Sequence, residues 1–289
     1  MQLLVILLII AAAITHASWN AVVKVSKNIL ALMWWATVFG TVGYGVWLAT
    51  GPGIFLNPGS RIPFLISAIC ETGYFVALVK GYSQGDLSLV YPISRGSAPI
   101  FAVLIGAVVL AESLPPVGYL GVTLMVLGVF AASQPIEQSK IKFGFSRIVG
   151  DRAVGWALAS GVFIAIYSIS DKVAVAATNP LVYNWWVFAG NAVLWAPFVW
   201  RRFNFKTNLN ELRNNWWSVI IVGVLMVGAY ALALAALALT SASYVVAGRG
   251  LSVIIGACLG SFILKERFGT VRIIGATLMV AGLALIAFS

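Results

Sequence analysis

The chain has 289 residues, of which 61% are hydrophobic and 9% are charged, and its formal net charge is +10. A soluble domain carries about 25% charged residues, so the composition excludes a water-soluble globular protein and predicts an all-α integral membrane protein. In a soluble protein this charge would suggest a nucleic-acid partner. Here the basic residues fall in short loops between apolar runs, which is typical of a membrane protein that binds no nucleic acid.

Ten apolar runs of about 20 residues are long enough to cross a bilayer as helices. They cover residues 2–23, 30–50, 62–82, 87–110, 115–133, 153–175, 180–200, 216–238, 241–264 and 269–288. The first run lacks the basic start and the small-residue cleavage site of a signal peptide, so we expect it to be a transmembrane helix. Turn sequences such as Asn179-Pro180 separate the runs, and two longer polar stretches, 134–152 and 201–215, are expected to be loops.

The sequence contains a repeat, because residues 85–133 align without a gap onto residues 239–287. The matched charged and small positions are Arg95 with Arg249, Gly96 with Gly250, Gly106 with Gly260, Glu112 with Glu266, Gly121 with Gly275 and Gly128 with Gly282. We therefore expect a first five-helix repeat over 1–133, a cytoplasmic linker over 134–152 and a second five-helix repeat over 153–289. Five is an odd number, so the second repeat enters the membrane upside down, which gives inverted-topology symmetry.

The loop charges predict an orientation. Nearly all loop Lys and Arg residues lie on the side opposite the N-terminus, whose own side has little beyond Arg61 and Lys172. Cytoplasmic loops carry the excess of basic residues, so we expect both termini outside a plasma membrane, with a bacterial inner membrane as the leading candidate. Tryptophan pairs near the predicted helix ends are interpreted as interfacial belts, at Trp34, Trp35, Trp185, Trp186, Trp216 and Trp217.

Three segments together resemble a known family. They are Ala111-Glu112-Ser113-Leu114 with Gly121 to Gly128, the second copy from Lys265-Glu266-Arg267-Phe268 to Gly282, and the opening His16-Ala17-Ser18-Trp19-Asn20. They are similar to the EamA-like branch of the drug/metabolite transporter superfamily, and the resemblance covers nearly the whole chain. It implies ten helices in two inverted repeats that move small metabolites by alternating access, in a family with many exporters of amino acids. The shared glycines and glutamates are specific for the fold and do not identify the substrate.

Ionisable residues inside membrane helices are costly and usually face a cavity or a partner. Four candidates lie inside the predicted spans and away from the span ends, namely Glu71, Arg95, Asp171 and Arg249. Arginine suits a planar anion, so we interpret Arg95 and Arg249 as residues that bind an anionic substrate group. The alternative is a structural role, with each arginine bonded to a buried acid or to helix carbonyls. Pro92 and Pro99 interrupt the span of Arg95, which predicts a locally broken backbone there.

The two acids have different expected roles. The second repeat has Leu225 where the first has Glu71, so Glu71 breaks the symmetry and is expected to carry a coupling proton or to bind a substrate ammonium. The alternative for Glu71 is a static salt bridge to Arg95 or another base. Asp171 is expected at about the depth of Arg249, where a salt bridge between them could serve as an outer gate.

The first span carries a polar and aromatic face, because His16, Trp19 and Asn20 follow the spacing i, i+3 and i+4. We expect this face to point inward and to contact substrate, with a hydrogen-bonded structural histidine as the alternative. Tyrosines near the ionisable residues are further candidates, since an aromatic ring with a polar tip suits an amino acid or a cation. They are Tyr74, Tyr91, Tyr230 and Tyr244, and their alternative is simple packing.

The sequence has one histidine, two separated cysteines and no nucleotide, flavin or nicotinamide motif, which predicts no metal site, no cofactor and no enzymatic activity. We expect a secondary transporter of a small polar organic metabolite, first an amino acid or related organic anion, with export favoured and protons or exchange as the driving force. The alternatives are a transporter of cationic amines or drugs, a passive channel and a lipid-handling membrane protein. Two repeats in one chain predict a monomer.

Overall fold

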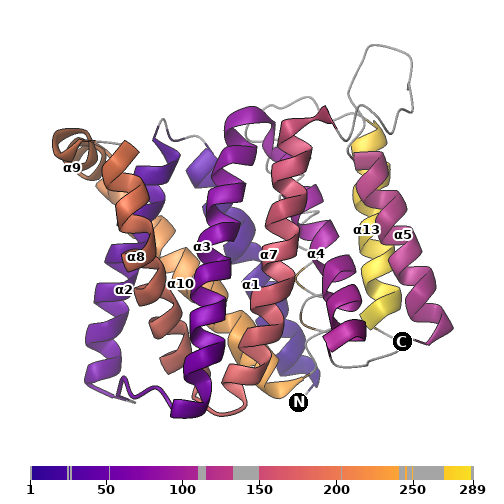
Figure 1. The fold of residues 1–289 in the computed structure, drawn as a ribbon, viewed down its shortest axis with the longest axis horizontal. Helices are drawn as coiled ribbons and strands as arrows, with labels where there is room; N and C mark the ends of the chain where they lie inside the picture. Colours follow the sequence, from indigo (N-terminus) through magenta and orange to yellow (C-terminus); the bar gives the residue numbers. More distant parts are fainter. Residues whose placement is uncertain are drawn as a thin grey trace. The chain divides into compact units, whose positions relative to one another are not determined.

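The computed structural model describes residues 2–24, 26, 28–51, 53–109, 115–132, 150–202, 204–240, 245, 249 and 270–287. Within these residues the structure consists of helices joined by short turns, without a β-strand (Figure 1). The elements of the first half are α1 (Gln2–Lys24), α2 (Ile29–Ala49), the 3-10 helix η1 (Pro58–Ser60), α3 (Arg61–Gln84), α4 (Leu87–Val109) and α5 (Pro116–Ala132). Those of the second half are α7 (Arg152–Val175), α8 (Pro180–Arg202), α9 (Phe205–Asn214), α10 (Trp216–Leu239) and α13 (Thr270–Ala287).

The predicted all-α fold is confirmed for the described part of the chain. Nine of the ten predicted spans coincide with a helix, and the ninth, 241–264, lies outside the described residues except for Val245 and Arg249. Helices α1, α2, α3, α7 and α10 are each long and apolar enough to cross a membrane. The helices therefore form where the apolar runs predict them.

Side chains cap the helices at the turns that the sequence predicts. Asn179 Oδ1 accepts a hydrogen bond from the Leu181 amide at 2.9 Å, with Pro180 as the first residue of α8. Asp151 Oδ1 accepts from the Ala153 amide at 2.8 Å at the start of α7. At the other end of a helix, Lys172 Nζ donates to the carbonyl oxygens of Leu237 and Thr240, at 2.7 and 2.8 Å. These bonds satisfy backbone groups that a helix end leaves open.

The backbone of α4 is not interrupted at its prolines, although a local break was expected there. It continues through both Pro92 and Pro99, so the predicted interruption is wrong. Each proline removes one N–H donor and displaces the carbonyl four residues earlier, here those of Ser88 and Arg95. The other hydrogen bonds of the helix remain, and membrane helices tolerate proline where neighbouring groups satisfy the freed carbonyls.

The polar stretch 201–215 was expected to be a loop, and it contains the short helix α9. Asn204 begins this helix, because its Oδ1 accepts from the Thr207 amide at 2.8 Å. Glu211 fastens α9 to the turn between α1 and α2, accepting from Asn28 Nδ2 at 2.7 Å and from Ser26 Oγ at 3.3 Å. A search for long apolar runs misses such a helix, since it is short and polar.

The described chain divides into two compact units that do not coincide with the two sequence repeats. Unit 1 contains residues 1–72 and 167–240, and unit 2 contains residues 73–166 and 241–289. The boundaries fall within α3, after Thr72, and within α7, before Tyr167. Each unit thus combines segments from both halves of the sequence.

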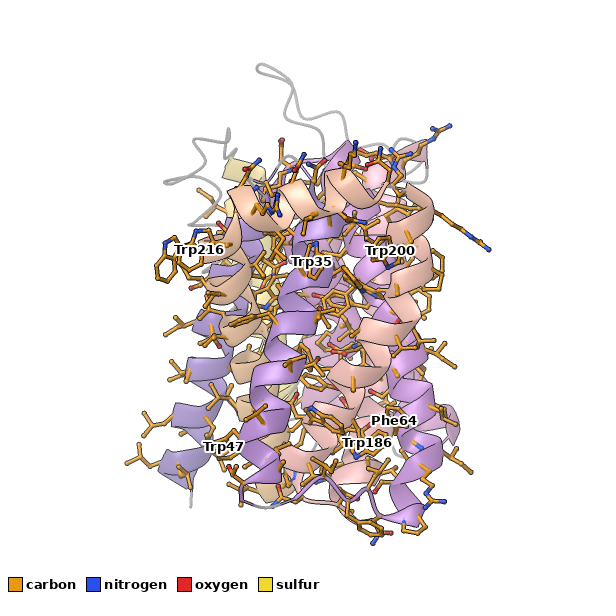
Figure 2. All side chains as sticks on the ribbon, turned by 90° about the vertical axis from the view of Figure 1, so that its left-hand side faces the viewer. Trp35, Trp47, Phe64, Trp186, Trp200 and Trp216 are labelled. Carbon is orange, nitrogen blue, oxygen red and sulfur yellow. The ribbon has the colours of Figure 1, made fainter. Side chains whose placement is uncertain are left out.

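In unit 1, α10 packs against α1, α2 and α8, and α2 also packs against α8 and α9. The α2–α10 contact is close, because a Cβ on Gly223 would lie 2.6 Å from the carbonyl oxygen of Ala36. Aromatic residues gather near both ends of these helices. Figure 2 shows Trp35, Trp200 and Trp216 toward one end and Trp47, Phe64 and Trp186 toward the other, as expected for interfacial belts.

In unit 2, α5 packs along α13, and α4 contacts both. Repeat-matched glycines meet crosswise between α5 and α13. A Cβ on Gly128 would lie 2.7 Å from the carbonyl oxygen of Gly275, and a Cβ on Gly282 would overlap that of Gly121. This reciprocal contact is what a twofold relation between the two copies produces, and it gives the shared glycines a packing role.

Candidate functional site

In unit 1 a buried carboxylate accepts hydrogen bonds from three hydroxyl groups. Asp171 lies in α7 and is 1% exposed. Its Oδ1 accepts from Ser67 Oγ at 2.6 Å and from the Tyr183 hydroxyl at 2.9 Å, and its Oδ2 accepts from the Tyr230 hydroxyl at 2.6 Å. These partners come from α3, α8 and α10. An ionised carboxylate is an acceptor only, so the arrangement suits a stable negative charge away from water.

Glu71 lies one helical turn beyond Ser67 on α3 and is also buried. The side-chain amide of Asn191 donates to Glu71 Oε2, and the Oδ1 of the same Asn191 accepts from Thr72 Oγ1 at 3.1 Å. Asn191 thereby fixes the Glu71 carboxylate from α8. Since Asn191 offers a neutral donor, Glu71 can gain or lose a proton without breaking an ion pair with this neighbour.

We use the name acidic cluster for Ser67, Glu71, Asp171, Tyr183, Asn191 and Tyr230, all in unit 1. Glu71, Asp171 and Tyr230 were predicted as site residues, and the structure places all three in this cluster. Ser67, Tyr183 and Asn191 were missed. Ser67 could have been found by its position one turn before Glu71, and Asn191 by its spacing of seven residues from the buried Asn184 on one face of α8.

The predicted polar face of α1 is buried in unit 1. His16, Trp19 and Asn20 are 7%, 1% and 1% exposed. Trp19 Nε1 donates to His16 Nδ1 at 3.1 Å, and Asn20 Nδ2 donates to the His16 carbonyl oxygen at 2.8 Å. The ring contact is edge to face, with centroids 4.9 Å apart. The bond from Trp19 makes Nδ1 the acceptor of the imidazole, and substrate contact by this face stays a prediction.

In unit 2, Arg95 lies against Tyr74. Its Nη2 donates to the Tyr74 hydroxyl at 3.4 Å, and its guanidinium carbon lies 5.6 Å from the centre of the Tyr74 ring. Arg95 is 5% exposed, and Tyr91, one turn earlier on α4, is also buried. Gly96 lets α4 approach α13, because a Cβ there would overlap the side chain of Met279.

Hydroxyl groups surround this part of α4. The Ser94 and Ser160 hydroxyls lie 2.6 Å apart, and Ser97 Oγ donates to the Ser94 carbonyl oxygen at 3.4 Å. A planar guanidinium beside a tyrosine hydroxyl and ring is suited to a carboxylate or another planar anion. We use the name arginine cluster for Tyr74, Ser94, Arg95 and Ser160.

Two predicted residues remain, Arg249 and Tyr244. Arg249 is helical and 8% exposed, and Tyr244 lies outside the described residues. The expected ion pairs of Glu71 with Arg95 and of Asp171 with Arg249 stay predictions. Within the described residues no three His, Cys, Asp or Glu side chains gather as metal ligands would.

Comparisons with known proteins place the chain in context. A model of the EamA-like transporter family matches residues 3–134 and again residues 151–288. No curated protein matches the chain by sequence. A solved crystal structure, described only as that of a protein, aligns with a TM-score of 0.61 over 99% of this chain and 96% of that chain. Its sequence identity is 15%, so this likeness shows the fold alone.

Proposed function

Because the chain belongs to the EamA-like transporter family, we propose that it is a secondary transporter that moves a small polar organic metabolite across a membrane by alternating access. It is a multi-pass membrane protein, with helices long and apolar enough to span a bilayer. The observation that carries the proposal is the set of buried ionisable side chains in these helices, namely Glu71, Arg95, Asp171 and Arg249. Such residues are retained in membranes mainly where they serve a substrate or ion pathway.

The leading substrate class is an amino acid or a related organic anion, with export as the favoured direction. Arg95 supplies a guanidinium that can hold a carboxylate by two parallel hydrogen bonds. Tyr74 orients this group, because it both accepts from Arg95 Nη2 and presents its ring to the guanidinium. Arg249, the repeat mate of Arg95, is the second candidate for the same task.

A second candidate substrate is a cationic amine or drug. The observation that favours it is the acidic cluster, where two carboxylates and two tyrosine hydroxyls lie in unit 1. A carboxylate with aromatic neighbours is a common site for an ammonium. Transport of amines with no transport of organic anions would select this candidate.

The decisive experiment is flux into liposomes containing the purified protein. We expect saturable uptake of a labelled amino acid or organic anion, and faster uptake when the liposomes are preloaded with the unlabelled compound. Counterflow of this kind separates a carrier from a passive channel. The absence of saturable flux for all amino acids, organic anions and amines would contradict the transporter proposal.

The arginine assignment has its own test. Replacing Arg95 or Arg249 by alanine removes a charged hydrogen-bonding group worth about 1.5 to 3 kcal/mol. We expect the KM for the substrate to rise by about tenfold to a hundredfold in at least one variant. Arg95→Lys keeps the charge and loses the planar fork, so we expect an intermediate KM. Wild-type KM values for both alanine variants would rule out anion binding by either arginine.

We assign the coupling proton, where transport is proton-driven, to Glu71. Its hydrogen-bond donor Asn191 is neutral, so protonation of the carboxylate breaks no ion pair with that residue. Glu71→Gln should abolish the dependence of flux on a pH gradient while substrate exchange continues. The matched control is Glu211→Gln in α9, which also changes a buried glutamate and should keep the pH dependence. Intact pH dependence in Glu71→Gln would contradict the assignment.

A further inference from the structure

Unit 1 contains a half-open groove. It is formed by residues 54–56 and by the first turns of α3 and α8. Its volume is about 740 Å³, within the range of small-ligand sites. The lining is Ile54, Phe55, Leu56, Arg61, Phe64, Leu65 and Trp186. Six of these seven side chains are apolar or aromatic, and the seventh is an arginine, so the groove suits a ligand with an apolar body and one negative charge.

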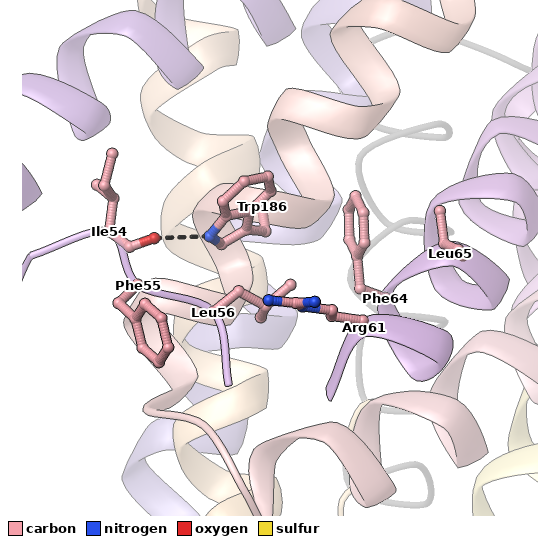
Figure 3. A pocket seen from close by; sticks show the side chains of 7 residues that line it. All are labelled: Ile54, Phe55, Leu56, Arg61, Phe64, Leu65 and Trp186. Atoms are coloured by element: carbon pink, nitrogen blue, oxygen red, sulfur yellow. Dashed lines mark hydrogen bonds between the residues drawn. The ribbon is translucent and has the colours of Figure 1, made fainter. Parts of the chain in front are cut away.

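The wall of the groove is held in place by specific contacts. Trp186 Nε1 donates to the Ile54 carbonyl oxygen at 2.8 Å, which ties α8 to the turn (Figure 3). Gly53 has a φ of 80°, a conformation that glycine adopts readily, and it turns the chain into the wall. Figure 3 shows the Arg61 side chain reaching from the start of α3 across the groove toward Leu56.

The positive charge of Arg61 is not neutralised by another residue of the described chain. The side chain is exposed, and no hydrogen bond or ion pair joins it to another residue of the described chain. Lys172, the other basic residue predicted for this side, instead donates to two carbonyl oxygens at the end of α10. An exposed guanidinium at the start of a membrane helix lies at the level of lipid headgroups.

An apolar stripe on α3 leads away from the groove. Ile62, Leu65, Ile66 and Ile69 follow the spacing i, i+3, i+4 and i+7 and are 42% to 70% exposed. This is one continuous helix face. It begins beside Arg61 and runs about 10 Å along the helix toward the membrane interior. A charged headgroup site therefore continues into a surface that an acyl chain can cover.

We propose that this groove binds an anionic phospholipid. The headgroup phosphate accepts hydrogen bonds from Arg61, and one acyl chain packs on Phe64 and Leu65 and continues along the α3 stripe. A zwitterionic lipid such as phosphatidylcholine gains less at this site, because its choline cation offsets the phosphate charge. The groove shares no residue with the acidic cluster or the arginine cluster, and the proposal does not depend on the identity of the transported substrate.

The experiment measures lipid binding to the purified full-length protein in detergent by native mass spectrometry, with phosphatidylglycerol and phosphatidylcholine as probes. We expect phosphatidylglycerol to bind the wild type more tightly than phosphatidylcholine does. Arg61→Gln should weaken phosphatidylglycerol binding about fivefold, the factor that corresponds to the loss of about 1 kcal/mol from an exposed ion pair. Arg201→Gln, an exposed arginine at the end of α8, is the matched control and should bind as the wild type does.

Two further arms identify the source of the phosphate. Leu65→Ser changes an exposed residue, so folding should be kept, and it should weaken phosphatidylglycerol binding if the acyl chain packs there. Soluble glycerol 3-phosphate should not displace the lipid. Equal phosphatidylglycerol affinity in Arg61→Gln and the wild type would overturn the proposal, as would displacement by glycerol 3-phosphate, which would indicate a site for a soluble phosphate compound.

Discussion

At the scale of single residues, the acidic cluster shows how a charge is accommodated in an apolar helix bundle. A buried ionised carboxylate is tolerated when its lone pairs are satisfied. Asp171 has three hydroxyl donors at 2.6 to 2.9 Å, and Glu71 has an amide donor. Three hydroxyl donors on Asp171 and a neutral amide donor on Glu71 fit a structural anchor beside a residue that changes its protonation.

This contrast predicts the stability of two variants. Asp171→Asn leaves Ser67, Tyr183 and Tyr230 facing an amide that accepts fewer hydrogen bonds, so it should unfold at a clearly lower temperature than the wild type. Tyr183→Phe removes only one donor and should cost about 1 to 2 kcal/mol. Thermal unfolding of the purified proteins in detergent gives both values. A melting temperature for Asp171→Asn equal to that of the wild type would show that the hydroxyls do not stabilise the carboxylate.

Many buried polar residues could be found from the sequence, because a polar side chain inside a long apolar run is conspicuous. His16, Asn20, Glu71 and Asp171 were found in this way. Their partners could not be identified, since Asp171 is bonded to Ser67 and Tyr230, which lie 104 and 59 positions away in the chain. Tyrosine and serine are common in membrane helices, so their presence alone indicates no site.

At the scale of helices, the repeat-matched glycines explain the close packing of α5 against α13 in unit 2. Gly128 of α5 lies against Gly275 of α13, and Gly282 of α13 lies against Gly121 of α5. The repeat-matched methionines show the same reciprocal arrangement. Met279 of α13 lies against Gly128 of α5, and Met125 of α5 lies against Gly282 of α13. Small residues let membrane helices approach until backbone atoms touch. The pairing explains why these glycines occur in register in both copies of the repeat.

A glycine substitution tests this contact. Gly128→Ala places a Cβ 2.7 Å from both the Gly275 carbonyl oxygen and the Met279 backbone nitrogen, so the two helices must separate. We expect a loss of about 1 to 3 kcal/mol of stability, as for other overpacked sites. The matched control is Gly155→Ala in α7, where no atom lies within 4 Å of an added Cβ, and its melting temperature should not fall. Equal melting temperatures for the two variants would show that α5 and α13 do not need the glycine.

Helix boundaries were predictable to different degrees. The spans were found because apolar length and hydropathy dominate in a bilayer. The short helix α9 was missed, since its stability depends on the Asn204 cap and on Glu211, whose partners Ser26 and Asn28 come from the start of the chain. The continuity of α4 through Pro92 and Pro99 was also missed, because the hydrogen bonds that remain around a proline depend on the folded surroundings.

At the scale of the whole molecule, sequence repeats and compact units divide the chain differently. The repeats follow the order of the sequence, whereas each compact unit takes segments from both halves. Helices α3 and α7 each contribute to both units, and the acidic cluster combines α3 with α7, α8 and α10 inside unit 1. Sites in this fold are therefore assembled from residues of both repeats.

The loop charges predict the topology of the whole chain, and cysteine labelling tests it. In a Cys70→Ala, Cys258→Ala background, Ala176→Cys in the exposed turn between α7 and α8 should react with a membrane-impermeant maleimide in intact cells. Ser139→Cys in the 134–152 linker should react only after the membrane is permeabilised, because the basic loops are expected in the cytoplasm. The opposite labelling pattern would reverse the predicted orientation and place both termini inside.

The sequence by itself determined that this chain is an all-α membrane protein with a repeat of the EamA-like type, because bilayer length, apolar composition and in-register glycines are properties of local residues. It also identified the four ionisable residues in the spans, since such residues are rare there. Only the tertiary structure decided three other features. Asp171 accepts hydrogen bonds from three hydroxyls, Asn191 donates a hydrogen bond to Glu71, and Arg61 is the charged residue that lines an apolar groove. Hydrogen bonds between distant helices depend on which faces meet, and the register of those faces is set by packing.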